Sequence, residues 1–314
     1  MNHSLLAPLS QAIARLHLPH TDDHRRHPAA DRLHARSVAF LVAQGLAPDP
    51  ATRRTLDRAA VVEGMVIALP DLAEPLLQLA VDWTNHNCLH DDAVEASDLG
   101  GRMDSYAVAA LSRRYTEALR GLDDGEGAHP LVRAMVSWRR RALALELDEA
   151  TLERFAARAG AMASQFALER LMADHGVRLD EQEYLRQRVS AGPFDAWFAL
   201  ILMVLGPERQ LASVSAEALR RSAVEMTVCG NELRTCAREL AQGIEVNLIA
   251  RAADPEAAIL RLLDRHNACA RRFQAAVARL PDDPHRALAA ALARAVYATH
   301  VYELRSIRGL ALAA

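Results

Sequence analysis

The chain lacks several features that would assign it to a familiar class of protein. It contains no lysine, and its 37 basic residues are arginines spread over the whole chain, which indicates a compositional bias. Its 4 cysteines form no CxxC pair, so neither a zinc site nor a disulfide framework is indicated. The formal net charge is only -3, which argues against a basic surface for nucleic acid.

Long apolar runs are absent as well. No run is long enough to span a membrane, and residues 1–6 lack the basic region and following apolar segment that mark a signal peptide. We therefore expect a cytoplasmic protein, either an enzyme or a binding protein.

The residues that are present indicate a helical protein. Of the 314 residues, 51% are apolar and 25% are charged, which is typical of a soluble globular chain. Ala, Leu, Arg and Glu dominate, clusters of β-branched residues are short, and Gly and Pro breaks separate the helical stretches. The pattern predicts helices at about 30–46, 52–66, 70–96, 101–121, 129–145, 149–173, 178–190, 194–204, 214–249, 254–280 and 285–308.

The predicted helices show no division into separate domains. We find no internal repeat and no low-complexity linker, so we expect one all-α domain over residues 1–314. Pro8, Pro19 and Pro28 predict an irregular N-terminal strap over about residues 1–28.

One predicted helix carries a set of oxygen ligands. Asn231, Thr235 and Glu239 place an amide, a hydroxyl and a carboxylate at positions i, i+4 and i+8. On an α-helix these side chains lie within about 80° of one another, on one face. Oxygen ligands on a rigid face suit Mg²⁺, which keeps several waters and shares its shell with phosphate oxygens. In isolation the pattern also fits an exposed helix with ordinary polar residues.

An acidic cluster lies far upstream of this helix. Asp91, Asp92 and Glu95 follow a long apolar stretch, where unpaired carboxylates would be costly unless cations neutralise them. Asp91 and Glu95 are one helical turn apart and can share a metal environment. Other acidic pairs, such as Asp123-Asp124, stand beside Gly, Pro or Thr and predict turns or helix caps instead.

Together the two motifs resemble the metal-binding motifs of bacterial class I terpene synthases. The resemblance implies an all-α, single-domain helical bundle around a central active-site cavity. It implies that Asp91 binds Mg²⁺ with support from Asp92 and Glu95, and that the motif from Asn231 to Glu239 chelates another ion. Three Mg²⁺ ions with bound diphosphate are expected, with Mn²⁺ as an alternative.

Further positions extend the resemblance. Arg188 stands where the family carries an arginine that senses diphosphate, and Gly192 supplies the helix break that follows it, so we expect both to act in catalysis. Without its neighbours, Arg188 would be interpreted as a surface residue near a helix end. Arg238 stands where the family has a basic residue that touches the diphosphate, and Gly243 and Asn247 resemble downstream family positions.

The C-terminal end matches in part. Family members carry an Arg-Tyr pair with an aromatic residue six positions before the arginine. Tyr302 and Arg308 keep this spacing, but Gly309 stands in place of the tyrosine. The resemblance therefore implies that Arg308 binds diphosphate in a site that lacks the usual phenol.

The implied activity is that of a Mg²⁺-dependent carbon–oxygen lyase acting on phosphates. It would ionise a linear prenyl diphosphate, form a terpene hydrocarbon or alcohol and release diphosphate. Farnesyl diphosphate is the first expectation, geranylgeranyl diphosphate the second and geranyl diphosphate the third. Besides this small-molecule substrate we expect no nucleic acid and no membrane span, with a homodimer as an alternative to a monomer.

Other functions remain open. A trans-prenyl diphosphate synthase-like prenyltransferase shares the fold but carries two aspartate-rich motifs, whereas the second motif here is Asn/Thr/Glu. A helical interaction protein would need no aligned ligands. A catalytically inactive helical homologue is a further alternative because of Gly309.

The aromatic residues are few, at 4% of the chain, and five of them are candidates to line an apolar pocket and stabilise a carbocation. The alternative for each is ordinary core packing. His86 and His90 could accept protons or form hydrogen bonds inside the bundle, and we favour the second role. The pocket candidates are Trp83, Phe194, Trp197, Phe198 and Tyr302.

Overall fold

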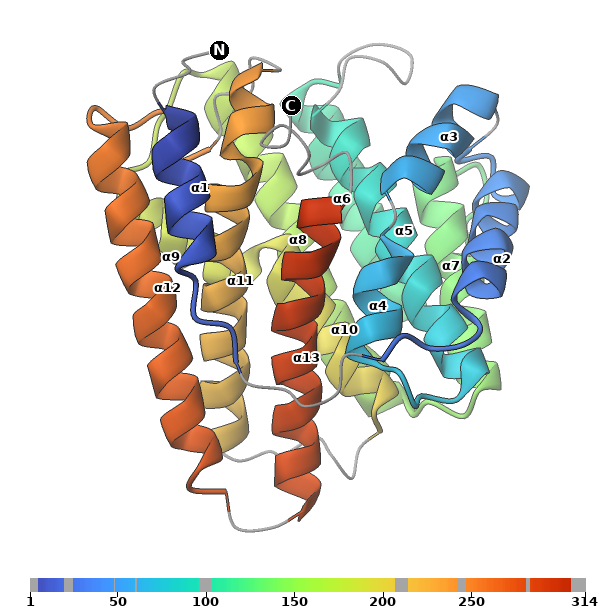
Figure 1. Cartoon of the computed structure of the whole chain (residues 1–314). Helices are drawn as coiled ribbons and strands as arrows, with labels where there is room; N and C mark the ends of the chain where they lie inside the picture. The colour runs from blue at the N-terminus through green and yellow to red at the C-terminus, as the bar shows by residue number, and fades with distance from the viewer. Residues whose placement is uncertain are drawn as a thin grey trace. The chain divides into compact units, whose positions relative to one another are not determined.

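The computed structural model describes residues 5–19, 25–47, 49–59, 61–95, 103–206, 214–241, 247–280 and 283–305. Within these ranges the regular secondary structure is helical, with no strand, so the predicted all-α class is confirmed (Figure 1). The helices are α1 (Leu6–Ala14), α2 (Ala30–Ala43), α3 (Pro50–Ala59), α4 (Val62–Ala68), α5 (Glu74–Glu95), α6 (Ser105–Arg120), α7 (Pro130–Ala144), α8 (Glu149–Asp174), α9 (Glu181–Ala191), α10 (Pro193–Val204), α11 (Val214–Ala241), α12 (Pro255–Val277) and α13 (Asp283–Arg305).

Aspartate caps fix where several of these helices begin. The residue before each of α6, α8, α9 and α12 is an aspartate whose carboxylate accepts a hydrogen bond from a backbone N–H three residues on, at 2.7 to 3.0 Å. Each cap satisfies an N–H that the helix itself cannot pair and is worth about 1 kcal/mol. The capping residues are Asp104, Asp148, Asp180 and Asp254.

The helices group into two compact units, each built from separate stretches of chain. One, here called the α11 unit, holds α1, α4, α11, α12 and α13, and the other, the α5 unit, holds α2 and α5 to α10. One of the four boundaries between the units falls within α3, after Leu56. Because the units alternate along the chain, neither is a continuous segment, and a single domain over 1–314 stays a prediction.

In the α11 unit, α11 packs against α1, α12 and α13, and α13 packs against α4. Figure 1 shows α1 running along α11 and α12. The helix α1 corrects the expectation of an irregular strap over residues 1–28. Pro8 is its third residue, where a backbone N–H has no partner within the helix, so the proline is tolerated. Leu9 and Ala12 bury the inner face of α1.

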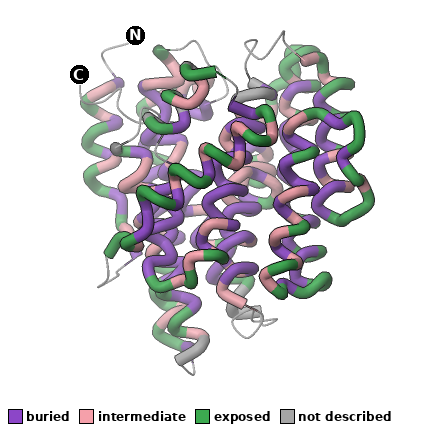
Figure 2. Tube along the Cα trace, turned by 90° about the vertical axis from the view of Figure 1, so that its right-hand side faces the viewer, coloured by how far each residue is buried: buried purple, intermediate pink, exposed green. Residues whose placement is uncertain are grey.

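In the α5 unit, α5 packs against α2, α7, α8 and α10, while α6 packs against α7 and α8. Every residue of α5 from Leu79 to Asn87 is buried, which confirms that the acidic cluster ends a mostly buried helix. Most other helices alternate between buried and exposed positions, as amphipathic helices around a core do (Figure 2). Some polar groups inside α5 are paired: Asp82 accepts hydrogen bonds from Arg141 at 2.6 Å and from Gln78 at 2.9 Å. Others, such as the side-chain oxygens of Asn85 and Asn87, are buried without a hydrogen-bond partner among the described residues.

Two predicted helices have different bounds. The helix expected over 52–66 is divided into α3 and α4. Val62, Met65 and Val66 of α4 are all buried, whereas α3 is rich in arginine. The first of these helices ends at Ala59, and the second begins at Val62.

The helix expected over 214–249 ends at Ala241. The Asn247 Nδ2 donates to the Glu232 carbonyl at 2.9 Å, and the Leu248 backbone N–H donates to the Glu232 carboxylate at 2.8 Å. A continuous helix would place Asn247 about 22 Å along the axis from Glu232. Asn247 and Leu248 therefore lie back against α11, beside Glu232.

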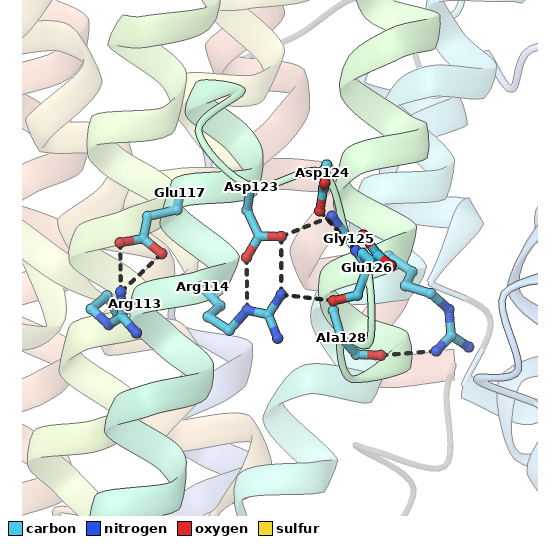
Figure 3. A network of polar contacts seen from close by, with 9 residues as sticks. Arg113, Arg114, Glu117, Asp123, Asp124, Gly125, Glu126 and Ala128 are labelled. Carbon is cyan, nitrogen blue, oxygen red and sulfur yellow. Dashed lines mark hydrogen bonds and ion pairs between the residues drawn. The ribbon is translucent and has the colours of Figure 1, made fainter.

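The turn between α6 and α7 carries a polar network (Figure 3). Asp123 accepts a hydrogen bond from the Gly125 N–H at 2.8 Å, and Asp124 accepts one from the Glu126 N–H at 2.9 Å, so the turn predicted for this acidic pair is confirmed. Arg114 donates to both carboxylate oxygens of Asp123, at 2.7 and 3.1 Å. Arg114, Asp123 and Asp124 also line a cavity of about 520 Å³, together with Arg139 and Arg140.

Candidate active site

The three predicted ligands of the second motif lie on α11 with their side chains held by neighbours. The Thr235 hydroxyl is buried and donates to the Asn231 carbonyl at 2.9 Å. The Asn231 Nδ2 donates to Glu303 Oε1, on α13, at 2.8 Å. The hydroxyl therefore uses its one donor hydrogen within the protein and the amide one of its two, and their oxygen lone pairs remain for a ligand.

Both oxygens of the Glu239 carboxylate accept hydrogen bonds. The Arg238 Nη2 donates to Oε1 at 3.0 Å, and the Asn247 Nδ2 donates to Oε2 at 2.9 Å. The Asn247 Oδ1 in turn accepts a hydrogen bond from the Ile249 N–H at 2.9 Å. Asn247 thus ties the carboxylate to the segment that turns back onto α11, and Arg238 lies beside the same carboxylate.

The chemistry of these donors fits a hard divalent cation. An amide, a hydroxyl and a carboxylate supply oxygen atoms only, and each carboxylate oxygen keeps a lone pair after accepting one hydrogen bond. Among the described residues there is no group of three or more His, Cys, Asp or Glu side chains placed to hold a metal. The α11 motif is a different kind of ligand set, because two of its three oxygen donors are an amide and a hydroxyl.

The first motif lies at the end of α5. Asp91 is half-buried there, while the side chains of Asp92 and Glu95 lie outside what the structure describes. Asp91 belongs to the α5 unit and Asn231 to the α11 unit. A joint metal site built from both motifs stays a prediction.

Two buried histidines precede Asp91 on α5. A His86 ring nitrogen lies 2.9 Å from the Leu131 carbonyl, which gives His86 the hydrogen-bonding role that we favoured. The His90 ring packs on those of Tyr115 and Phe166, with centroids 5.0 and 5.2 Å apart. Neither of its nitrogens has a hydrogen-bond partner among the described residues, so the hydrogen-bonding role that we favoured is wrong for His90. Burial lowers the pKa of His86 to about 4 and that of His90 to about 3, so both rings are neutral at pH 7.

The predicted helix break follows Arg188. The helix α9 ends at Ala191, and α10 begins at Pro193. The Gly192 N–H donates to the Arg188 carbonyl at 3.2 Å, and the Arg188 guanidinium lies 5.9 Å from the centre of the Tyr184 ring. The roles of Arg188 and Gly192 in catalysis stay predictions.

The aromatic pocket candidates are mostly buried. The Trp83 Nε1 donates to the Tyr115 hydroxyl at 3.0 Å, and the Trp83 ring meets Phe155 edge-on at 5.3 Å. Trp197 and Phe198 are buried and meet edge-on at 5.3 Å. Phe194 and Tyr302 are half-buried. Burial fits both core packing and a pocket wall, so the pocket role of all five stays a prediction.

Some expected residues lie outside the described part of the chain, and some structural partners were not expected. Arg308 and Gly309 lie beyond residue 305, and Gly243 falls in the gap after Ala241. Sequence reasoning missed Arg234 and Glu303, which form a buried ion pair behind Asn231. The sequence indicated this pair only weakly, because Arg234 is a charged residue between apolar positions of α11.

The described residues form an all-helical fold in which one long helix carries an amide, a hydroxyl and a carboxylate on one face. The profile of the family described as "Terpene synthase family 2, C-terminal metal binding" matches residues 82–272, which is more than half of the chain. The chain belongs to this family of terpene synthases, whose members are carbon–oxygen lyases acting on phosphates. A comparison with curated proteins finds no match.

Solved structures show the same fold. The linalool/nerolidol synthase from Streptomyces clavuligerus superposes with a TM-score of 0.77 at 20% identity, over 91% of this chain and 99% of that one. The SVS_A2 protein from ancestral sequence reconstruction gives 0.75 at 16% identity, over 92% and 90%. Hedycaryol synthase in complex with nerolidol gives 0.66 at 17% identity, over 92% and 99%. The predicted class I terpene synthase fold is thereby confirmed.

The hydropathy of the helices adds one observation. Among the described residues no helix is both long enough and apolar enough to cross a membrane.

Proposed function

We propose that the chain ionises a linear prenyl diphosphate in a Mg²⁺-dependent reaction, with farnesyl diphosphate favoured over geranylgeranyl and geranyl diphosphate. The allylic cation becomes a terpene hydrocarbon or alcohol, and diphosphate is released. The observation that carries this proposal is the α11 motif, in which Asn231, Thr235 and Glu239 are each held by hydrogen bonds and offer oxygen atoms.

The names of the similar structures support this substrate class. One structure of the Streptomyces clavuligerus linalool/nerolidol synthase is a complex with 2-fluorogeranyl diphosphate. The hedycaryol synthase structure holds nerolidol. These names describe those proteins, and we extend to this chain only the use of a prenyl diphosphate.

In the proposed reaction the leaving group is diphosphate, which the metal ions and arginines would bind. The C–O bond breaks with its electron pair on a diphosphate oxygen, so negative charge must be stabilised there. Mg²⁺, when bound, would act as a Lewis acid on the diphosphate. Arg188, Arg238 and Arg308 would donate charge-assisted hydrogen bonds to the same group. The aromatic side chains would exclude water from the cation, which then loses a proton or accepts a water.

The test is a product assay on the purified chain. It is incubated with Mg²⁺ and each of the three diphosphates, with and without isopentenyl diphosphate, and the extracts are separated by gas chromatography. We expect terpene products from farnesyl diphosphate that disappear when EDTA is added. A longer prenyl diphosphate, formed only with isopentenyl diphosphate, would indicate a prenyltransferase instead. No conversion of any substrate would indicate an inactive homologue and overturn the proposal.

The oligomeric state and the cellular location of the chain are also part of this proposal. We keep the sequence-based expectation of a cytoplasmic enzyme that is a monomer or a homodimer. Size-exclusion chromatography with light scattering measures the mass in solution and decides between the two assemblies.

A further inference from the structure

Glu303 binds two α11 side chains at once. Its Oε1 accepts a hydrogen bond from the Asn231 Nδ2 at 2.8 Å, and its Oε2 forms an ion pair with the Arg234 Nε. The side chains of Arg234 and Glu303 are only 2% and 3% exposed. All three residues lie in the α11 unit, on α11 and α13.

The burial of this pair requires an explanation. A carboxylate withdrawn from water is costly to the fold unless it is paired, and replacing such a pair with apolar residues is often neutral or stabilising. The chain also leaves room for the guanidinium, because a Cβ on Gly230 would lie 2.4 Å from the Arg234 Nη1. Stability alone therefore gives little reason to keep Glu303 and Arg234 here.

The position of Asn231 supplies a functional reason. An asparagine amide has two faces of similar shape, and its χ2 angle is broadly distributed, so an unrestrained side chain presents either oxygen or NH₂ outward. An ionised carboxylate accepts hydrogen bonds and donates none. Glu303 therefore selects the orientation in which Nδ2 faces α13, because the flipped amide would set oxygen against oxygen. The Asn231 Oδ1 is then left on the side of the amide that faces away from Glu303.

Arg234 supplies the positive charge that pairs with the Glu303 carboxylate. Its Nε compensates the carboxylate, and its Nη1 lies 3.3 Å from the His300 Nδ1. Burial and the neighbouring guanidinium lower the pKa of His300 to about 4, so the ring is neutral at pH 7 and its Nδ1 can accept a hydrogen bond. Each charged group of the pair thus has a partner.

We propose that Glu303 and Arg234 are positioning residues that orient the Asn231 amide so that its oxygen, and not its nitrogen, is presented to the metal. This inference rests on the proposed function, in which Asn231 is a metal ligand. The two residues act through Asn231 and touch neither metal nor diphosphate.

The test compares two proteins in which a net-neutral ion pair of α11 is removed. Arg234→Met with Glu303→Leu deletes the positioning pair. Arg265→Met with Glu225→Leu deletes a more exposed pair between α12 and α11, in which Glu225 also pairs with Arg272, and serves as the control. Mn²⁺ binding in the presence of inorganic diphosphate is measured by the electron paramagnetic resonance of free Mn²⁺, and folding is followed by thermal melting.

We expect the first protein to melt near the wild-type temperature but to bind Mn²⁺ roughly 10- to 100-fold more weakly, as loss of an outer-shell partner does. The control should bind like wild type, and Arg234→Lys, which keeps the charge, should retain most of the affinity. Equal Mn²⁺ affinity in the folded Met/Leu protein and in wild type would overturn the proposal. If the Met/Leu protein does not fold, Arg234→Met with Glu303→Gln takes its place, because a neutral amide pairs with Asn231 in either orientation.

A second comparison separates positioning from a structural role. Asn231→Asp replaces the amide with a symmetric carboxylate that needs no orientation and that Glu303 repels. Deleting the pair should therefore weaken Mn²⁺ binding when residue 231 is Asn but strengthen it when residue 231 is Asp. The same direction of change in both backgrounds would overturn the positioning role.

The controls also separate this inference from the proposed function. A wild-type protein that binds no Mn²⁺ with diphosphate, or an Asn231→Ala protein that binds it normally, would overturn the metal assignment and this inference with it. Normal wild-type binding that Asn231→Ala abolishes and that the pair deletion leaves unchanged would overturn this inference alone.

Discussion

The Arg188 carbonyl oxygen occupies the space that a side chain on Gly192 would need. It accepts the Gly192 N–H at 3.2 Å and would lie 2.3 Å from a Cβ built at residue 192. Real Cβ contacts do not approach this closely, so the break between α9 and α10 accommodates only glycine without a backbone shift. The break and the candidate diphosphate sensor are therefore one structural element.

This contact makes Gly192→Ala a test of the break. The backbone must move to admit the methyl group, and a shift of a positioned group by about 1 Å can cost roughly 100-fold in rate. We expect at least about tenfold lower kcat, measured with the preferred diphosphate. Gly127→Ala is the control, because a Cβ there meets nothing within 4 Å although φ is 58°. It should lower the melting temperature slightly and keep kcat. Unchanged kcat in Gly192→Ala would refute a role for the break.

Arg188→Lys tests the sensor itself. Lysine keeps the positive charge but loses the planar fork that donates two parallel hydrogen bonds, so we expect ionisation to slow by at least about tenfold. The exposed neighbour Arg186, which pairs with Glu183 at 2.5 Å, provides a control substitution to lysine. Kinetics and product profiles are measured for both variants. A match between Arg188→Lys and wild type in rate and products would remove the sensor assignment.

The metal ligands are tested by Asp91→Ala and Asn231→Ala. Each should lower turnover by orders of magnitude, because fewer ligands hold the cation that stabilises the departing diphosphate. Circular dichroism should show that the helices remain. Asp124→Ala removes an exposed carboxylate whose hydrogen bond serves the α6–α7 turn, and it should keep full turnover. Near-normal turnover in either ligand variant would contradict its assignment.

Trp197→Ala tests the pocket. If Trp197 lines the pocket in which the cation reacts, the variant should change the ratio of products more than it changes the consumption of substrate. Phe198, which meets Trp197 edge-on at 5.3 Å, preserves some of the local packing. Products are quantified by gas chromatography, with melting measured in parallel. A folded variant with the wild-type product mixture would place Trp197 outside the pocket.

The stability of the chain should fall in acid through its buried histidines. His266 bonds the Met226 carbonyl through Nδ1 at 2.9 Å, and burial lowers its pKa from 6.5 to about 4. The unfolded chain then binds a proton more tightly, so the contribution to stability is complete above pH 6.5 and is lost as the pH falls towards 4. In that window one such histidine lowers the free energy of unfolding by up to roughly 1.4 kcal/mol per pH unit.

Urea unfolding of His266→Gln at a series of pH values measures how much His266 contributes to the pH dependence of stability. Glutamine can still bond the Met226 carbonyl but does not titrate, so the dependence of the unfolding free energy on pH should be shallower than in wild type. Identical slopes would show that His266 does not take up the proton on unfolding.

The sequence by itself determined the helical class and the spacing of the α11 ligands. Both follow from local geometry, since a residue and its neighbours four and eight positions on share a face of any helix. The acidic end of α5 and the break at Gly192 were predictable for the same reason: apolar runs, glycine and proline act on the backbone next to them.

The partners of those residues were decided only by tertiary structure. Asn231 meets Glu303, which is 72 residues away, and Arg234 meets the same carboxylate across a separation of 69. The turn of Asn247 back onto α11 and the packing of α1 also depend on contacts across helices. Which face of one helix meets which face of another is set by packing the whole core. A pattern in the sequence therefore predicts the ligands but does not predict the residues that hold them in place.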